Sequence, residues 1–380
     1  MRLIGNKTKS PQSHSAAAAH LQITIAHQFT PSTKLIMPPF NPSPDALSAQ
    51  PFESLESLEL EHLPKLNHRH LASSGSTNSE LITALQHGSL NTAEMHLLTA
   101  ETQSAGRGQH GRSWQSPRGN VYLSLYHPVH MPISGLLSLI IGVELAKMPV
   151  IQTLNEQLRA QGLTAIGVKW ANDLGFYSKQ YSQQHSFQNQ SEPKSNDAAL
   201  KPLESTKQTL PFHKLAGILI EPVTKAGKLV GVVMGVGLNV QATPKLTAQT
   251  CEGMSYQAIS LRDICALLAP KAPPISLPDL KTLYQQMSES LIAAMTRFEY
   301  LGLEKPTGQR YYLDSFLAQF DAMDALAGLR LRVTQDYNGN VETLTGYACG
   351  LDTHGCLQLR EYNGKISALF TGRIDVIGDA

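Results

Sequence analysis

The hydrophobic positions of this chain repeat with two periods, which separate extended segments from helical ones. At 120–126 (NVYLSLY) the apolar residues Val121, Leu123 and Leu125 alternate with the residues between them. This alternation predicts a strand, because successive strand side chains point to opposite faces of a sheet. Residues 95–103 (MHLLTAETQ) are also expected to be extended and to run into a glycine-rich loop.

Two longer extended segments are separated by a turn signal. KLAGILIEPV (214–223) and KLVGVVMGVGLNV (228–240) both predict strands, and Lys-Ala-Gly at 225–227 lies between them. Short connections that contain glycine join the strands of hairpins. The sequence therefore predicts a β-hairpin here.

Helical periodicity follows several candidate caps. Thr77 and Glu80 have the spacing of a capping box at the start of a helix. Ser134 is the candidate cap of a helix that ends near Met148, because Pro149 disrupts a helix interior. The remaining helical segments are expected at about 149–161, 260–269 and 277–320.

The last fifty residues differ in character. LRLRVT, ETLTGYACGL, CLQLRE and ISALFTG are short strand patterns separated by YNGN, DTHG and YNGK turns. Asn-Gly at 338–339 and 363–364 is typical of hairpin turns. Residues 325–377 are therefore expected to form a small separate β-barrel.

Two stretches lack a sustained period. Residues 1–65 are rich in Ser, Pro, Ala and His and are expected to be mostly disordered, with order beginning near Leu71. Residues 1–44 carry basic but no acidic residues, and we favour a disordered tail or a true start at Met37 over a transit peptide. Residues 178–210, rich in Gln, Ser, Asn and Lys, predict a mobile insertion between two ordered strands.

Composition narrows the class of protein. The 380 residues have a net charge of +1, which argues against bulk nucleic-acid binding. The 4 cysteines show no C-x-x-C spacing, so neither a zinc site nor a redox motif is indicated. The longest apolar helix candidate, LLSLIIGVELA, is interrupted by Glu144 and is too short to span a membrane. A cytoplasmic protein is expected.

The segment GRGQHGRSW (106–114) carries the first candidate chemistry. Its G-x-G-x-x-G spacing is followed by a strand rather than a helix, which excludes a dinucleotide fingerprint, and no GK[ST] closes it as a Walker A loop. Arg107 and Arg112 can contact phosphate or carboxylate oxygens, and Trp114 offers a large face to anchor the loop. The composition favours a loop that folds over an anionic ligand; the alternative is a surface loop with solvated arginines.

Three further segments carry small or charged residues at element ends: Ser76-Thr77-Asn78, VKWANDL (168–174) and KLAGIL (214–219). Taken one at a time, each also has a plain interpretation. The first is then a helix cap, the second an Asn-Asp turn, and the third begins with a solvated lysine.

In their order along the chain, STN, Q-x-A-G-R-G-x-x-G-R-x-W, KWxNDL, KLAGIL and GxGxN resemble the catalytic domain of the biotin protein ligases. The resemblance covers roughly 73–260, and GLDTHGCLQL (350–359) resembles the family's SH3-like C-terminal domain. It implies an α+β fold with a mixed, largely antiparallel sheet and helices, similar to class II synthetases. The implied domains are a poorly ordered 1–70, a catalytic 71–323 and an SH3-like 324–380.

The resemblance also implies an activity. Biotin protein ligases use ATP and Mg²⁺ to convert biotin to biotinyl-5′-adenylate and then pass biotin to a lysine of a biotin carboxyl carrier protein, typically of acetyl-CoA carboxylase. A lipoate- or octanoate-protein ligase of the same fold and a non-catalytic biotin sensor are the alternatives. Residues 1–70 show no winged-helix pattern, so no DNA partner is expected, while homodimer formation stays open.

Carried over by motif, the resemblance assigns roles to individual residues. Lys214, Arg107 and Asp173 are the expected catalytic residues, with Asp173 as base and Mg²⁺ ligand. The biotin contacts are expected at Ser76, Thr77, Asn78, Gln103, Arg107, Gly108, Gln109, Lys214 and Gly217, and the ATP or adenylate contacts at Gly106, Arg112, Trp114, Lys169, Asn172, Asp173 and Asn239.

Two positions depart from the family pattern. The family loop usually reads GRGRRG, whereas this chain has Gln109 and His110. One cation is therefore missing, and His110 replaces it only when protonated. We expect a leakier hold on the adenylate. KWPNDL has become KWANDL, which removes a proline but no polar group.

Overall fold

The computed structural model describes residues 66–129, 131–178, 209–244, 256–269, 274–301, 311–337 and 339–378. All of them belong to one unit of the chain, Glu61–Ala380. The expectations for residues 1–65 and for most of the 178–210 insertion lie outside the described residues.

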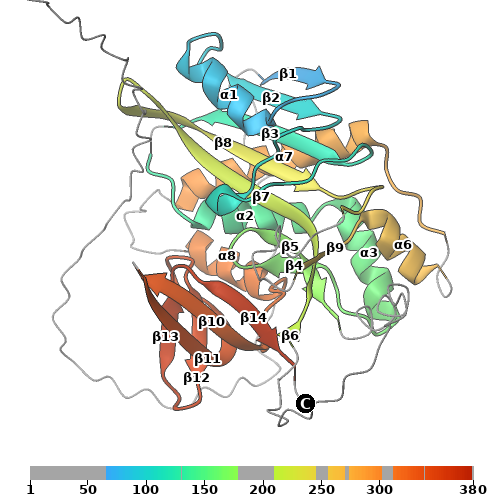
Figure 1. Ribbon diagram of the computed structural model, residues 1–380, viewed down its shortest axis with the longest axis vertical. Coiled ribbons are helices and arrows are strands. Elements are labelled where there is room, and N and C mark those ends of the chain that lie inside the picture. The colour runs from blue at the N-terminus through green and yellow to red at the C-terminus, as the bar shows by residue number, and fades with distance from the viewer. Residues whose placement is uncertain are drawn as a thin grey trace, which may run out of the picture. The chain divides into compact units, whose positions relative to one another are not determined.

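The main sheet has the strand order β1-β2-β3-β8-β7-β5-β4, and β9 pairs with β7 (Figure 1). Only β1–β2 and β7–β9 are parallel among its pairings. The expected mixed, largely antiparallel sheet is thus confirmed. The strands are β1 (Leu66–Leu71), β2 (Met95–Ala100), β3 (Val121–Pro128), β4 (Gly167–Lys169), β5 (Asp173–Tyr177), β7 (Phe212–Lys225), β8 (Lys228–Leu238) and β9 (Tyr256–Ala258).

The predicted hairpin is β7–β8. Lys225 and Lys228 are its last paired residues, and Ala226 and Gly227 form the turn with φ of 50° and 76°. Two positive φ values in a two-residue connection match the right-handed twist of the flanking strands. The hairpin's long strands place residues of 214–221 beside those of 233–238, where the site lies.

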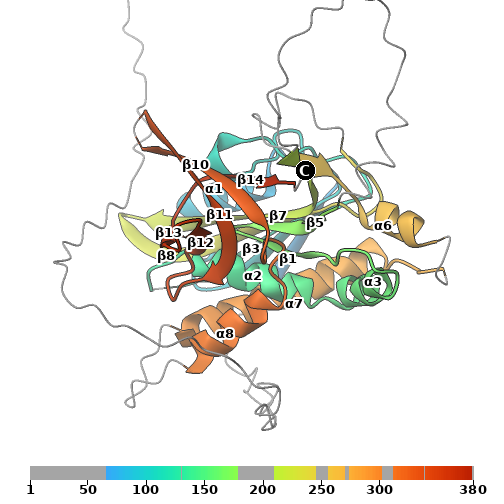
Figure 2. The ribbon, with the colours of Figure 1, turned by 90° about the horizontal axis from the view of Figure 1, so that it is seen from below.

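Helices cover both faces of this sheet. α1 (Thr77–Gln86) packs against β3, β7 and β8, whereas α2 (Leu136–Ala146) and α7 (Leu280–Leu301) lie on the opposite face (Figure 2). Because α2 is buried between β7 and α7, nearly all of its residues are apolar. The other helical elements are α3 (Pro149–Ala160), α6 (Leu261–Leu268), α8 (Tyr311–Asp321) and the short 3₁₀ turn η3 (Gln109–Gly111).

No single described helix is long and apolar enough to cross a membrane; α2 and α3 meet that criterion only as a pair, bent by 70°.

A second sheet has the order β13-β12-β11-β10-β14-β6. It includes one strand from outside the expected 325–377 segment, because β6 pairs with β14. The turn between β11 and β12 contacts the turn between β4 and β5, because Trp170 Nε1 donates to Gly355 O at 2.9 Å. Val168 of β4 also exchanges backbone hydrogen bonds with residues 323 and 325, which lie between α8 and β10. The expected small β-domain at the C-terminal end agrees with this second sheet, and its independence from the rest of the chain stays a prediction. The strands are β6 (Thr209–Leu210), β10 (Arg330–Tyr337), β11 (Asn340–Leu351), β12 (Leu357–Glu361), β13 (Ile366–Leu369) and β14 (Arg373–Ile377).

Several boundaries differ from the expected ones. Order begins by Leu66 rather than Leu71, because β1 pairs with β2 through its backbone although its side chains are polar. The described parts of the 277–320 segment belong to α7 and α8. Pro149 does not only end a helix; it begins α3, where its missing N–H costs nothing.

The capping box at Thr77 is also wrong. The N-cap of α1 is Ser76, whose side chain makes no capping hydrogen bond. Glu80 instead accepts from Ser74 Oγ at 2.5 Å and from Gly75 N at 3.1 Å, so it orders the loop before the helix.

Candidate functional site

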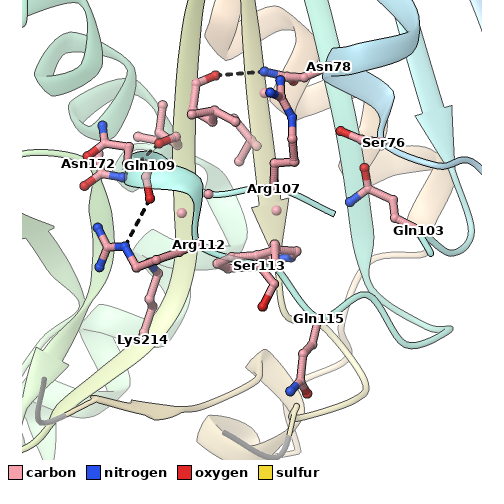
Figure 3. Close-up of a pocket in the computed structure, with 18 of the residues that line it drawn as sticks. Ser76, Asn78, Gln103, Arg107, Gln109, Arg112, Ser113, Gln115, Asn172 and Lys214 are labelled. Atoms are coloured by element: carbon pink, nitrogen blue, oxygen red, sulfur yellow. Dashed lines mark hydrogen bonds between the residues drawn. The ribbon is translucent and has the colours of Figure 1, made fainter. Parts of the chain in front are cut away.

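A pocket lies on the sheet face that carries α1, where the start of that helix, the open end of the β7–β8 hairpin and the 106–115 loop meet (Figure 3). It brings together most of the residues that the sequence assigned to a site. The expected residues in its wall are Ser76, Thr77, Asn78, Gln103, Arg107, Gly108, Gln109, Arg112, Trp114, Asn172, Lys214, Gly217 and Asn239.

Three expected residues are not in the wall. Gly106 lies in the loop, where a side chain would collide with the carbonyl of Trp114 at 2.4 Å. Lys169 and Asp173 are buried directly behind the wall, on β4 and β5. They act on the pocket through the residues that they contact.

Glycines form the floor of the pocket. A Cβ on Gly237 would lie 2.5 Å from the Trp114 ring, and one on Gly217 would lie 2.9 Å from it. A Cβ on Gly235 would lie 2.1 Å from Asn78 Oδ1. The hairpin backbone is therefore bare at these positions so that Trp114 and Asn78 can lie directly on it.

The glycine-rich loop folds back on itself above this floor. Gly108 N donates to Arg112 O at 2.7 Å and Trp114 N donates to Gly106 O at 2.8 Å, which closes a small turn around η3. At its tip His110 has φ 56° and is exposed, outside the pocket wall. The expectation that a protonated His110 could replace the missing cation is therefore not supported by its position.

One end of the pocket is lined by hydroxyl and amide groups. Gln103 Oε1 accepts from Thr77 N at 2.9 Å, so a side chain from the loop satisfies an N–H of the first turn of α1. Ser124 Oγ lies 2.7 Å from Thr77 Oγ1 and 2.5 Å from Asn78 Oδ1. These contacts fix the polar groups in position before any ligand arrives.

The other end is cationic. Lys214 Nζ lies 2.7 Å from Asp173 Oδ1, and Lys169 Nζ donates to the Tyr256 hydroxyl at 2.7 Å. Arg112 lies beside Lys214 and donates from Nε to Gln109 O at 3.1 Å (Figure 3). Lys214 and Lys169 lie near a single carboxylate, and Arg112 adds a third positive charge at this end, which makes it attractive to an anion.

Burial and charge shift the pKa values here in opposite directions. Burial alone would raise the pKa of Asp173, but the ammonium groups of Lys214 and Lys169 outweigh it and hold that pKa below its ordinary value. Burial lowers the pKa of Lys169 to about 8, although Asp173 opposes that shift. Asp173 is therefore ionised and a weak proton acceptor, which argues against the expected role as a general base.

The site does not fit a resident metal ion. Asp173 already contacts Lys214 through Oδ1 and the Tyr256 hydroxyl through Oδ2, at 3.0 Å. Within the described ranges, no group of three or more His, Cys, Asp or Glu side chains could hold a metal. Asp173 is thus better explained as the anchor of Lys214 than as a Mg²⁺ ligand.

Arg107 has an ion-pair partner that the sequence analysis missed. Its guanidinium contacts Glu221 Oε2, which also accepts from Asn78 Nδ2 at 2.9 Å. Glu221 could have been found by alternation, since it lies on β7 two and four residues beyond Leu219 and Gly217, which line the pocket.

Two expected ATP-side amides hold backbone while lining the pocket. Asn172 Nδ2 donates to Ile218 O at 2.9 Å, which fastens the β4–β5 turn to β7. Asn239 Nδ2 donates to Ile259 O at 3.2 Å and lies 3.4 Å from Lys214 O. The wall also contains residues that were not predicted: Ser113, Gln115, Leu123, Ile218, Leu219, Gly235, Val236, Gly237, Pro244, Tyr256 and Ala258.

Known proteins match this chain. Two relatives described as "Bifunctional ligase/repressor BirA", from Salmonella typhimurium and Escherichia coli, are each 28% identical over 304 residues, which is 79% of this chain and 71% of the relative. The structure of "Biotin protein ligase from Aquifex aeolicus in complex with biotin and ATP" aligns with a TM-score of 0.49 and 18% identity, over 81% of this chain and 97% of that one. A Leishmania major biotin protein ligase in complex with biotinyl-5-AMP aligns with a TM-score of 0.42 and 18% identity, over 80% and 99%.

A family model described as the biotin/lipoate A/B protein ligase family matches residues 73–239, which contain α1, the loop and the β7–β8 hairpin. Residues 73–239 are therefore similar to the biotin/lipoate A/B protein ligase family.

Proposed function

We propose that this protein activates biotin with ATP to biotinyl-5′-adenylate and then transfers biotin to a lysine of a carrier protein. The observation that carries the proposal is a pocket with a hydroxyl and amide end, a cationic end and a loop of Gly and Arg above a glycine floor. Biotin has a ureido ring at one end and a carboxylate at the other, which matches these two ends.

In the first step a carboxylate oxygen attacks the α-phosphorus of ATP. A new O–P bond forms, the bond to the β-phosphate breaks and pyrophosphate leaves. Two anions must approach each other, so a cationic site lowers the barrier. Lys214 and Arg112 line the pocket at that end, and Lys169 adds charge from behind.

In the second step a neutral lysine amine of the carrier attacks the acyl carbon. A C–N bond forms, the bond from the acyl carbon to the phosphate oxygen breaks, AMP leaves with that electron pair, and the amine proton passes to the leaving phosphate or to water. The mixed anhydride would hydrolyse in water, so a closed site protects it. The half-buried Trp114, lying on Gly217 and Gly237, holds the loop over the floor. Asp173, whose pKa is lowered, keeps Lys214 in position rather than accepting the amine's proton.

The polar end favours biotin over the rival substrates. A ureido group has two N–H donors and one carbonyl acceptor, and the hydroxyls and amides at Ser76, Thr77, Asn78 and Gln103 can both donate and accept. The hydrocarbon chains of octanoate and lipoate offer no such groups, so they would form no hydrogen bonds at this end. In this proposal Mg²⁺ enters with ATP, as part of the substrate.

The same proposal also concerns the acceptor protein, the cellular compartment and the domain boundaries. We infer that the acceptor is a biotin carboxyl carrier protein such as that of acetyl-CoA carboxylase, and that the enzyme acts in the cytoplasm. Residues 71–323 would form the catalytic domain and 324–380 the SH3-like domain.

The test is incorporation of labelled biotin into a purified carrier domain, with ATP and magnesium. Wild type should transfer the label, and Lys214→Ala should lose transfer by at least about 100-fold. Tyr284→Phe, which removes a buried hydroxyl outside the pocket, serves as the control. If wild type binds biotin but does not transfer it, a biotin sensor is supported instead. If wild type transfers lipoate or octanoate, biotin is not the substrate.

A further inference from the structure

Tyr256, at the start of β9, joins the charged groups behind the pocket. Its hydroxyl accepts from Lys169 Nζ at 2.7 Å and donates to Asp173 Oδ2 at 3.0 Å. Its ring lies 4.6 Å from Lys169 Nζ and 5.4 Å from Lys214 Nζ. The same side chain also lines the pocket, so it links the buried pair to the ligand space.

Two lysines lie near the Asp173 carboxylate, and one of them contacts it directly. Lys214 contacts Asp173 through Oδ1, while Lys169 contacts the Tyr256 hydroxyl rather than the carboxylate. Lys169 is only 4% exposed. An ammonium group that is buried needs acceptors, because leaving it without a partner is costly.

We propose that Tyr256 is a positioning residue that keeps Lys169 away from Asp173, so that the carboxylate remains available to hold Lys214 at the pocket. Without the hydroxyl, the nearest anionic acceptor for Lys169 is Asp173, which is its direct partner in the β4–β5 pairing. Lys169 would then turn to that carboxylate and loosen the ion pair with Lys214. The effect on catalysis rests on the proposed function; the effect on Lys214 does not.

The hydroxyl can be separated from the ring by one substitution. Tyr256→Phe keeps the aromatic wall of the pocket and the ring contacts with both ammonium groups, but it removes the acceptor for Lys169 and the donor for Asp173. If Tyr256 served only as a wall for the ligand, Tyr256→Phe would behave as wild type. Tyr284→Phe is the matched control, because the Tyr284 hydroxyl donates to Ala100 O at 3.1 Å and its side chain is not in the pocket wall.

The first experiment needs no ligand. Full-length wild type, Tyr256→Phe and Tyr284→Phe, each checked for the same unfolding temperature, are treated with a lysine-acylating reagent, and the labelling of Lys214 is followed by mass spectrometry. We expect Lys214 to react faster in Tyr256→Phe only. Equal rates in all three proteins overturn the proposal whether or not the protein is a biotin ligase.

The second experiment measures adenylate formation as pyrophosphate release. It uses biotin or, if wild type does not turn it over, whichever of lipoate or octanoate wild type activates. Loss of hydrogen bonds to charged groups should lower kcat about 10- to 100-fold in Tyr256→Phe, with the KM for the acid changed much less. A change in KM alone overturns the positioning role.

A double-mutant cycle completes the test. Lys169→Met removes the ammonium group that would compete for Asp173, so adding Tyr256→Phe to it should change kcat little further. Additive losses overturn the proposal, because they would mean that Tyr256 acts independently of Lys169. Failure of wild type to form any adenylate contradicts the proposed function instead, and the labelling experiment still decides the role of Tyr256.

Discussion

One methyl group at Gly237 tests how the glycine-rich loop is held. A Cβ at this position would lie 2.5 Å from Nε1 and Cε2 of Trp114 and 2.7 Å from Cζ2. Ordinary contact begins near 3.4 Å. In Gly237→Ala the indole must therefore retreat by about 1 Å or leave its place on the hairpin.

The magnitude follows from that overlap. Forcing an additional methyl group into a packed contact costs about 1–3 kcal/mol, which for a unit of this size lowers the unfolding temperature by about 2–5 °C. Gly135→Ala is the matched control, because a Cβ there meets nothing within 4 Å and its φ is −59°. Its effect should stay within about 0.5 kcal/mol.

Tryptophan emission reports the movement directly. The chain has 2 tryptophans, and Trp170 is buried with its indole bound to Gly355 O at 2.9 Å, so a change in emission reports Trp114. Gly237→Ala should shift the emission to longer wavelength and increase quenching by acrylamide. Emission, quenching and stability equal to those of Gly135→Ala would refute the placement of Trp114 on the hairpin.

Three further changes have defined outcomes. Glu221→Gln removes the ion-pair partner of Arg107, so trypsin should cut the 106–115 loop faster. Because the pair is partly exposed, the free energy of unfolding should change by less than about 1 kcal/mol. Unchanged cleavage would mean that the pair does not restrain the loop. Gln109→Arg adds a cation to the loop and should reduce the amount of adenylate that hydrolyses per biotin transferred. Equal hydrolysis in the variant and in wild type would contradict the expectation that Gln109 weakens the hold on the adenylate. Burial raises the pKa of Asp324 to about 6 from 3.8, so the unfolded chain ionises first and stability falls as the pH rises from about 4 to 6. Asp324→Asn should therefore stabilise the protein by up to about 3 kcal/mol at pH 7 and very little at pH 4, measured by denaturant unfolding, and equal effects at both pH values would contradict the shift.

The sequence predicted the elements whose signals are local. The β7–β8 hairpin was predicted because alternating residues flank a short turn that contains glycine, and the loop at 106–114 was placed correctly between two strands. Most of the pocket residues lie on these two elements or at the start of α1. Their motifs were readable because each is contiguous along the chain.

The contacts between distant segments were not readable. Tyr256 reaches Lys169 across 87 residues, and neither position signals the other. β1 and β6 form through backbone pairing with strands far away in the chain, so their polar or very short sequences carry no periodic signal. The exact partner of each charged group depends on such pairings, which is why the sequence assigned Asp173 to a base rather than to Lys214.

The hydrogen bond from Trp170 to Gly355 has a consequence for thermal stability. It joins the turn between β11 and β12 of the second sheet to the turn between β4 and β5, whose flanking residues Lys169 and Asp173 carry the charges behind the pocket. Melting of the second sheet would then release that turn, so probes placed on the described parts of the two sheets should report coincident unfolding transitions. Loss of activity after removal of the second sheet would therefore reflect disorder of the turn between β4 and β5. It would not show that the second sheet contacts the substrate.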